Sequence, residues 1–181
     1  MSYLGEIRIN WSQLLSAAVG LALGSALSHY TMSMFGPPIL EEFGWSKSQF
    51  ALIGSLPLIS MLFVPVAGRF TDRFGTRVAA MVGFTGVPLG FIGYAMMDGS
   101  ITQFLAIYII QHILGILTTS LVFCRIIVER FDAARGIALS IIMTGPPLAG
   151  AILAPTLGAI IQTEGWRIAF LLLAALSGLG G

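Results

Sequence analysis

Long apolar stretches separated by short clusters of charged residues dominate the sequence. Five stretches contain no Asp, Glu, Lys or Arg over 20 to 32 residues, and the longest lies between Arg8 and Glu41. A helix needs ~20 apolar residues to cross the hydrocarbon core of a bilayer. A sixth apolar stretch follows Arg167 and runs to Gly181, which is too short for a full crossing. The pattern therefore predicts an all-α membrane protein with six transmembrane helices.

The ends of the expected helices follow from the charge clusters. The spans are residues 11–35, 48–70, 78–97, 101–128 and 136–161, with a last helix that begins near Trp166. Because the sequence stops inside an apolar run without a charged or aromatic anchor, we expect helix 6 to be truncated and the chain to be a fragment of a longer one. Residues 1–181 would then form a single transmembrane bundle.

Composition agrees with this picture and excludes several function classes. Hydrophobic residues make up 56% of the chain and charged residues 9%, against about 25% in a typical soluble domain. A net charge of +1 gives no basis for nucleic-acid binding. Two His and one Cys provide no usual metal or haem spacing. We therefore expect no metal, no cofactor and no enzymatic activity.

The basic residues are divided unevenly between the two sides that the six spans define. One side holds only Lys47 and Arg167. The other holds seven of the nine basic residues, namely Arg8, Arg69, Arg73, Arg77, Arg125, Arg130 and Arg135. Cytoplasmic loops of membrane proteins carry the excess of Lys and Arg. We therefore expect a multi-pass protein of the plasma (inner) membrane with its N-terminus in the cytoplasm.

Several residues in and after the second expected helix recur 90 residues later, in and after the fifth. Pro57, Pro65, Gly68, Gly75 and Arg77 are matched by Pro147, Pro155, Gly158, Gly165 and Arg167. The offset spans three helices, and because three is odd, the second unit enters the membrane from the opposite side. Inverted repeats of this kind occur in many secondary transporters, although Gly and Pro are frequent in membrane helices generally. The offset predicts two inverted three-helix repeats, approximately 11–97 and 101–181.

The segment after the second helix reads Gly68-Arg69-Phe70-Thr71-Asp72-Arg73-Phe74-Gly75-Thr76-Arg77. It resembles the signature loop of the major facilitator superfamily, G-x-x-x-D-R-x-G-x-R/K, and matches at Gly68, Asp72, Arg73, Gly75 and Arg77. The resemblance implies that the chain is the N-terminal six-helix bundle of a transporter of this family. A positively charged cytoplasmic loop with one acid is the alternative interpretation.

A second charged segment follows the fourth helix and reads Glu129-Arg130-Phe131-Asp132-Ala133-Ala134-Arg135-Gly136. It resembles the Glu…Arg-Gly segment that the same family places between helices 4 and 5. There the segment exchanges salt bridges with the signature loop when the cytoplasmic side closes. The resemblance thus implies a cytoplasmic gate that combines the signature residues with Glu129, Arg130 and Arg135.

Helix 5 contains Gly145-Pro146-Pro147-Leu148-Ala149-Gly150. This segment partly resembles an antiporter-associated motif of the superfamily, roughly G-P-x-x-G-G, with Ala149 in place of a glycine. The residues themselves predict a helix bend and close packing at Gly145, Pro146, Pro147 and Gly150. Together with Glu42-Phe43-Gly44-Trp45-Ser46-Lys47 and Gly165-Trp166-Arg167, the pattern resembles bacterial relatives of the monocarboxylate and oxalate/formate carriers. Eukaryotic monocarboxylate carriers place a lysine in helix 1, and this helix has none.

Polar side chains inside the apolar stretches are candidates for a solute cavity, because such groups are costly in a membrane and often functional. His29 could carry a proton, and a neutral, hydrogen-bonded histidine is the alternative. Arg125 could reach the interface, hold the signature loop or contact an anion. Helix 4 also offers His112 and Thr119. The expected cavity residues are Ser25, His29, Tyr30, Ser33, Gln111, Thr118 and Arg125.

The resemblance implies secondary active transport of a small solute by alternating access, as symport or antiport. An organic anion such as a monocarboxylate is the expected solute class, with H⁺ as the candidate coupling ion. The expected partners are the solute, the lipid bilayer and the missing C-terminal six-helix half. Because binding sites in this fold lie between two halves, a non-transporting half-unit or membrane scaffold is the alternative.

Overall fold

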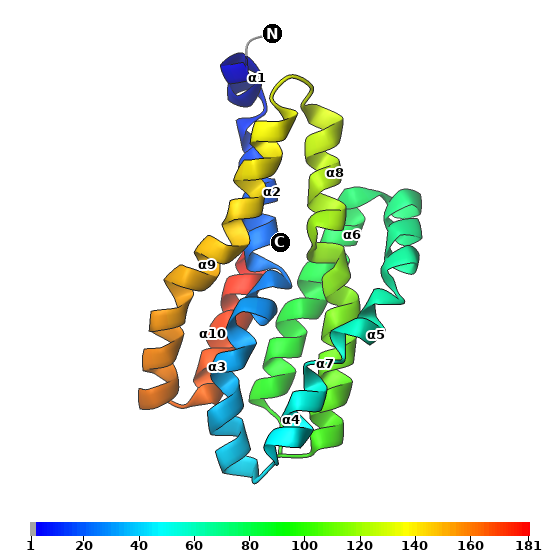
Figure 1. The fold of residues 1–181 in the computed structure, drawn as a ribbon. Coiled ribbons are helices and arrows are strands. Elements are labelled where there is room, and N and C mark those ends of the chain that lie inside the picture. The colour runs from blue at the N-terminus through cyan, green and yellow to red at the C-terminus, as the bar shows by residue number, and fades with distance from the viewer. Residues whose placement is uncertain (1–2) are drawn as a thin grey trace.

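The computed structural model describes residues 3–181, and all regular structure among them is helical. The helices form a bundle whose axes run roughly up and down in Figure 1. They are α1 (Tyr3–Ile9), α2 (Trp11–Leu23), α3 (Ala26–Phe43), α4 (Lys47–Ile53), α5 (Pro57–Met61), α6 (Val64–Ala95), α7 (Ile101–Gly115), the 3₁₀ turn η1 (Ile116–Thr118), α8 (Ser120–Arg130), α9 (Arg135–Thr163) and α10 (Trp166–Leu179).

The first expected helix is longer than predicted and is interrupted near its middle. It continues to the end of α3 at Phe43, and Gly24 separates α2 from α3 with non-helical angles (φ −78°, ψ −144°). The Ser25 N–H donates to Thr118 Oγ1 at 2.9 Å instead of to a carbonyl of its own helix. A Cβ at position 24 would lie 2.6 Å from Thr118 Cβ, so only glycine fits at this contact. A neighbouring segment therefore satisfies the free backbone donor at the interruption.

The second expected helix, residues 48–70, is not continuous. It consists of α4, α5 and the first part of α6, separated by short turns. Pro57 and Pro65 stand in the first turn of α5 and of α6. Proline lacks an N–H and disfavours a helical conformation in the residue before it, so each one starts a new helical segment. The prediction of a single uninterrupted helix was wrong because these two prolines were read as interior positions.

The chain reverses direction at Gly75, within the element α6. Gly75 has φ 84° and ψ 161°, a conformation that is essentially confined to glycine. In Figure 1 the segment before this point runs upward and the segment after it runs downward. Residues 76–95 thus correspond to the third expected helix. The expected loop 68–77 is almost entirely helical, with one glycine providing the turn.

The fourth expected helix is interrupted in the same region as the first. The α7 helix passes into η1, and Thr119 is extended (φ −94°, ψ −179°) before α8 begins at Ser120. The fifth, α9, is continuous through three prolines but changes direction in its middle in Figure 1. There Gly145 lies against the Ala18 carbonyl and Gly150 lies against Tyr30. These contacts bring α9 close to α2 and to α3.

An aromatic core holds the lower half of the bundle together. Phe35 on α3 stacks on Phe170 of α10 with ring centroids 3.9 Å apart, and Tyr94 lies 5.0 Å from both Phe170 and Phe104. All four rings are almost completely buried. Offset aromatic pairs of this kind contribute ~0.5–1.5 kcal/mol each beyond area burial. This core fixes α10 against α3 and α6.

Four of the described stretches are long and apolar enough to cross a membrane: Trp11–Phe43, Val64–Ala95, Ile101–Arg130 and Arg135–Thr163. The second contains the reversal at Gly75, and the apolar helix α10 is shorter. The prediction of an all-helical fold is confirmed for the described residues. The count of six crossings and the inverted repeat stay predictions.

Candidate functional site

A cavity of about 330 Å³ opens between α3, α5 and α7, next to both helix interruptions. Apolar side chains make up part of its wall, and no Asp, Glu, Lys or Arg is among its described lining residues. Its polar lining consists of Ser25, His29, Tyr30, Ser60, His112 and Thr119. A largely apolar cavity with a few convergent polar groups is the usual form of a small-molecule site.

The structure brings three of the seven expected cavity residues together here, namely Ser25, His29 and Tyr30. The imidazole of His29 meets the ring of Tyr30 edge-on, with centroids 5.5 Å apart. Ser33 is exposed but is not part of this lining, and the remaining three expected residues have other partners.

Gln111 and Thr118 are buried and hold helices together. Gln111 Nε2 donates to the Val87 carbonyl at 2.9 Å, and its Oε1 accepts from Ser28 Oγ at 3.4 Å. Thr118 Oγ1 accepts from Ser25 N–H and donates to the Gly115 carbonyl. Hydrogen bonds across helices are a usual role of such residues in membrane bundles. These contacts give both side chains a structural role at the edge of the cavity.

Three polar residues of the cavity, Ser60, His112 and Thr119, were not among the seven expected ones. Ser60 lies on α5 with its side-chain oxygen buried and without a hydrogen-bond partner in the described structure. His112 stacks on Tyr108 at 3.9 Å, and its Nδ1 is 3.0 Å from the Tyr108 carbonyl oxygen. A lone serine in an apolar run and a histidine beside Gln111 were the available signals. The sequence could not show that these residues line the cavity, because it does not show which helix faces meet.

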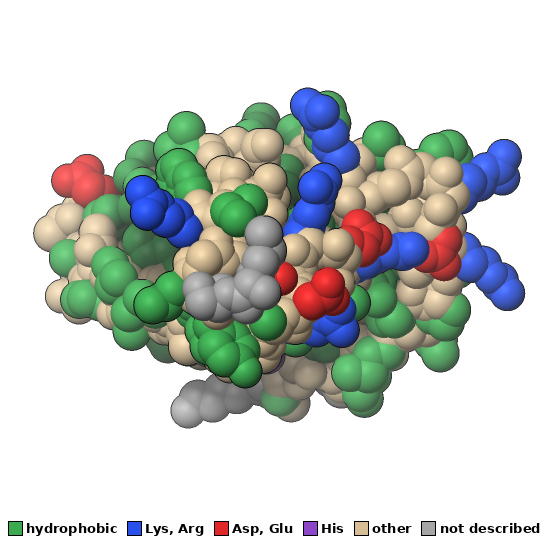
Figure 2. Space-filling view, turned by 90° about the horizontal axis from the view of Figure 1, so that it is seen from above, with side chains coloured by type: hydrophobic (Ala, Val, Ile, Leu, Met, Phe, Trp, Pro, Cys, Tyr) green, Lys and Arg blue, Asp and Glu red, His purple; other side chains and the backbone are tan. Residues whose placement is uncertain are grey.

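On the upper face, Arg125 joins the two segments that resemble family motifs. Its Nη1 donates to Asp72 Oδ1 at the end of the upward segment of α6, and its Nε donates to Glu129 Oε1 at 3.2 Å. All three side chains are substantially exposed, so each pair contributes only ~0–1 kcal/mol. Figure 2 shows acidic and basic side chains alternating on this face. Arg125 therefore belongs to the charged face and not to the cavity.

The other expected gate residues are arranged more loosely. Arg135 donates to Asp132 Oδ1 at 3.0 Å and to the Phe131 carbonyl at 2.9 Å, which closes the α8–α9 connection on itself. Arg73 lies over the ring of Phe74, and the Arg130 carbonyl accepts from Asn10. The described structure places no atom within 4 Å of a Cβ built on Gly68 or on Gly75. Arg77 lines a separate cavity near the end of α10.

Glu6 on α1 is a buried carboxylate that sequence reasoning missed. Its side chain is 7% exposed, and its two oxygens accept the N–H groups of Asp132 and Ala134, both at 2.7 Å. The hydrogen bond from Asp132 and then that from Ala134 lower the pKa of Glu6, because both stabilise the charged form. The only available signal was an acidic residue two positions before Arg8. The carboxylate ties α1 to the start of α9.

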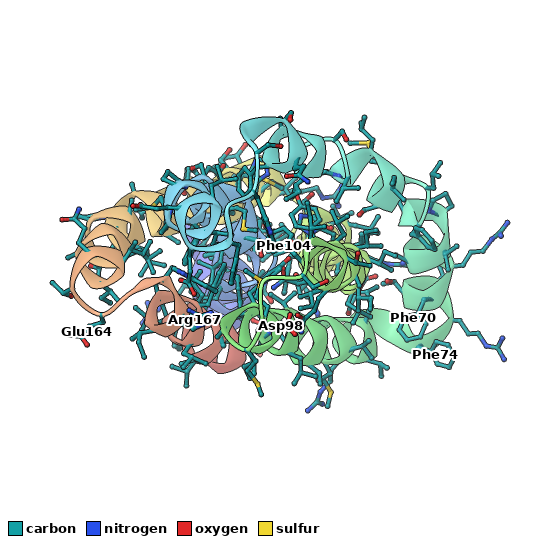
Figure 3. The ribbon with its side chains drawn as sticks, turned by 90° about the horizontal axis from the view of Figure 1, so that it is seen from below. Phe70, Phe74, Asp98, Phe104, Glu164 and Arg167 are labelled. Atoms are coloured by element: carbon teal, nitrogen blue, oxygen red, sulfur yellow. The ribbon has the colours of Figure 1, made fainter. Side chains whose placement is uncertain are left out.

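A second charged cluster lies on the opposite face. Arg167 Nη1 donates to Glu42 Oε1 at 2.6 Å, and Trp166 Nε1 donates to Glu42 Oε2 at 2.6 Å. Figure 3 shows Arg167 turned into the lower face, whereas Glu164 points outward. The contact links the end of α3 to the start of α10. No described group of three or more His, Cys, Asp or Glu is placed to hold a metal ion.

Comparison with known proteins identifies the family of this arrangement. The chain is 29% identical to human monocarboxylate transporter 11 over 175 residues, which is 92% of this chain and 36% of that protein. It is 29% identical to mouse monocarboxylate transporter 11, covering 92% and 38%, and 27% identical to human monocarboxylate transporter 7, covering 81% and 28%. The chain thus spans about a third of the length of these relatives. The expected resemblance to monocarboxylate carriers is confirmed, and these relatives are mammalian rather than bacterial.

The sequence pattern of one protein family matches nearly the whole chain. The sequence pattern of the Major Facilitator Superfamily matches residues 15–181, which include the cavity, the Asp72–Arg125 pair and both interrupted helices. The protein is accordingly a member of a family of membrane transporters. The chain belongs to the major facilitator superfamily.

Proposed function

We propose that the complete protein is a secondary active transporter that carries a small organic anion, such as a monocarboxylate, by alternating access with H⁺ as the coupling ion. The observation that carries this proposal is the cavity between α3, α5 and α7, because it presents two histidines and, among its described lining residues, no Asp, Glu, Lys or Arg to a bound solute. The names of the relatives support the solute class. The N-terminus is cytoplasmic in the plasma membrane, in keeping with the arginines on the upper face.

In this proposal the chain crosses the membrane six times, as two inverted repeats of three segments. The reversal at Gly75 supports the separation of the second and third segments. The Asp72–Arg125–Glu129 cluster, with Arg73, Arg130 and Arg135 beside it, stabilises the state that is closed to the cytoplasm. Exposed ion pairs suit this task because their small individual energies allow repeated opening.

A C-terminal half completes the transport pathway. Apolar side chains on the outer surfaces of α5 and α9 are exposed in the described structure, including Leu58, Leu62, Leu148 and Ile152. Exposed apolar patches of this kind need lipid or another part of a protein to cover them. We infer that a second helical bundle closes the cavity from this side.

The test is uptake by the complete protein in proteoliposomes. A panel of radiolabelled organic acids is applied with an inward proton gradient, and protein-free liposomes provide the background. Saturable uptake that responds to the gradient supports proton-coupled transport. Uptake that saturates without any response to the gradient contradicts the coupling ion but leaves transport intact.

A non-transporting half-unit or membrane scaffold is the second candidate, because binding sites in this fold lie between two halves. The two candidates differ in one observation. A scaffold inserts, folds and reaches the membrane but accumulates no member of the panel in either direction.

A further inference from the structure

Another cavity, of about 190 Å³, lies where the two parts of α6 meet α7 and η1, and all of its described lining residues are apolar. It shares none of them with the cavity between α3, α5 and α7. Phe63, Val66 and Val82 are exposed, so this second cavity opens on the outer surface of the bundle. Its other lining residues are Ala67, Phe70, Ile113, Leu114 and Leu117. We call this cavity the apolar pocket.

One face of α6 connects the apolar pocket to the charged upper face. The four pocket residues within 63–70 have the spacing i, i+3, i+4 and i+7, so they form one stripe about 10 Å long. Phe74 continues this stripe, because its ring centroid lies 4.7 Å from that of Phe70. Figure 3 shows both residues together at the outer edge of the bundle. The guanidinium carbon of Arg73 lies 5.4 Å from the Phe74 centroid, so a continuous series of contacts joins the pocket to a positive charge.

Arg69 and Arg73 stand one helical turn apart on α6, and both are exposed. Neither forms an ion pair with an acid among the described residues. Asp72, the acid nearest to them in sequence, is paired with Arg125 instead. Like charges four residues apart on a helix repel each other and destabilise it. An anion that is bound by both arginines would remove this repulsion.

A membrane phospholipid combines an anion and an apolar chain in the order in which this surface presents their partners. The planar guanidinium fork of arginine suits a phosphate group, and an acyl chain suits a pocket with an apolar lining. Basic sites between transmembrane helices on the cytoplasmic side bind anionic lipid headgroups. A soluble anion would leave the pocket empty, and an uncharged apolar molecule would leave both arginines unpaired. An anionic phospholipid satisfies the pocket and the arginines together.

We propose that this surface binds one anionic phospholipid of the cytoplasmic leaflet, with its phosphate between Arg69 and Arg73 and one acyl chain in the apolar pocket. Phe70 and Phe74 contact the lipid between its headgroup and that chain. The proposal rests on the membrane orientation proposed above, and it does not depend on which solute is carried. All of the residues that it uses lie within 63–117 of this chain.

The experiment counts the lipids bound to the complete protein by native mass spectrometry in an uncharged detergent and measures a Kd for each lipid. Dioleoyl phosphatidylglycerol is compared with dioleoyl phosphatidylcholine, which has the same acyl chains but no net charge. Glycerol 1-phosphate supplies the phosphate without acyl chains. We expect one copy of phosphatidylglycerol to bind at least tenfold more tightly than phosphatidylcholine, and glycerol 1-phosphate not to bind.

The arginines are tested by charge removal. Arg69→Gln combined with Arg73→Gln should raise the Kd for phosphatidylglycerol roughly thirtyfold, because each basic residue beside an anionic lipid strengthens binding about fivefold. The same variant should leave the Kd for phosphatidylcholine nearly unchanged. Arg8→Gln combined with Arg130→Gln is the charge-matched control, because these exposed arginines also lack an ion-pair partner among the described residues. The control should bind phosphatidylglycerol as the wild type does.

The apolar pocket is tested by filling it. Val82→Phe narrows the pocket and should raise the Kd for both phospholipids, because an acyl chain then has less room. Val128→Phe is the matched control, since Val128 is comparably exposed on α8 and does not line the pocket. It should leave both Kd values unchanged.

Three results would overturn the lipid site. Equal Kd values for the two phospholipids, or an unchanged Kd in Arg69→Gln/Arg73→Gln, would mean that lipid only coats the bundle. Binding of glycerol 1-phosphate as tight as that of phosphatidylglycerol would make this a site for a soluble phosphate. No bound lipid on the complete protein would mean that another part of the protein covers the pocket. Each result leaves the proposed transport function standing, because uptake of organic acids is measured separately.

Discussion

Gly75 and Gly165, which stand 90 residues apart, have nearly the same unusual backbone conformation. Gly75 has φ 84° and ψ 161°, and Gly165 has φ 89° and ψ 162°. The first interrupts α6 and the second lies between α9 and α10, whose connection is at the lower end in Figure 1. Both precede a helix that leads into the core. The agreement supports the inverted repeat and predicts that the two halves superpose by a rotation about an axis in the membrane plane.

Replacing either glycine by alanine should destabilise the fold. A side chain at these angles costs ~1–3 kcal/mol, although no neighbour would block the added Cβ. Gly178→Ala is the matched control, because its Cβ also meets nothing and the residue lies inside α10. The thermal unfolding temperature of the complete protein in detergent should be lower for Gly75→Ala and Gly165→Ala than for the wild type. Gly178→Ala should leave it unchanged. Equal unfolding temperatures for all three variants would show that the turn conformation carries no strain for alanine.

Asp72→Asn should slow transport while leaving expression and insertion nearly intact. The carboxylate is exposed, so its charge contributes ~0–1 kcal/mol to the pair with Arg125, enough to shift the equilibrium between inward and outward states by up to about fivefold. Access of a thiol reagent to an engineered cysteine on the cytoplasmic side of the cavity should rise. Asp132→Asn is the control, since its pair with Arg135 stays within one connection. Unchanged accessibility in Asp72→Asn would reduce Asp72 to a solvated surface residue.

Glu6→Gln should lower stability in a pH-dependent way. The pKa of Glu6 is lowered in the folded state, so its stabilisation is fully present above the ordinary glutamate pKa of about 4.3 and disappears as pH falls through the lowered value. The difference in unfolding temperature between wild type and Glu6→Gln should therefore be large at pH 7 and shrink below about pH 4. Glu164→Gln, an exposed acid, should show little difference at either pH. A constant difference across this range would mean that the carboxylate acts through shape and not through charge.

Thr118→Val should destabilise the bundle by ~1–3 kcal/mol. It removes the acceptor for the partly buried Ser25 N–H and leaves that donor without a protein partner beside the interruption of the first helix. Thr163→Val is the matched control, because Thr163 is exposed and bonds within its own helix. Hydrogen exchange at Ser25 should accelerate in Thr118→Val. If exchange and thermal stability both match the control, water must satisfy the Ser25 donor.

The positions of the long apolar helical stretches were predictable because the free energy of placing a charge in lipid acts on each segment separately. The charge gaps therefore located most of the helical stretches. The interruption at Gly24 was not predictable, since it depends on contact with Thr118, which is 94 residues away in the chain. Likewise, Pro57 and Pro65 stand at the start of new helical segments. From composition alone, a proline that starts a helix cannot be distinguished from one that kinks the interior of a helix.

The candidate site was only partly predictable for a related reason. Spacing along a helix shows which residues share a face but not which neighbour that face meets. His29 and Gln111 looked equally suitable as polar residues in apolar stretches. The structure places His29 in the cavity lining. Gln111 instead links α7 to α6 through a hydrogen bond that its side-chain amide donates to the Val87 carbonyl. Ser60 offered no distinguishing signal until its lack of a partner was visible.

The contact between Glu6 and the α8–α9 connection has a consequence for how the protein is made. Synthesis proceeds from the N-terminus, and the Glu6 contact with Asp132 joins residues that are 126 positions apart. The ribosome must therefore produce every segment through α8 before the carboxylate meets its donors. Glu6 is the first acidic residue to be synthesised, and neither of these two donors exists until Asp132 and Ala134 have been added to the chain. A nascent chain that stalls before that point carries a free N-terminal segment, so the burial of Glu6 marks the moment at which the first and fifth membrane segments have assembled.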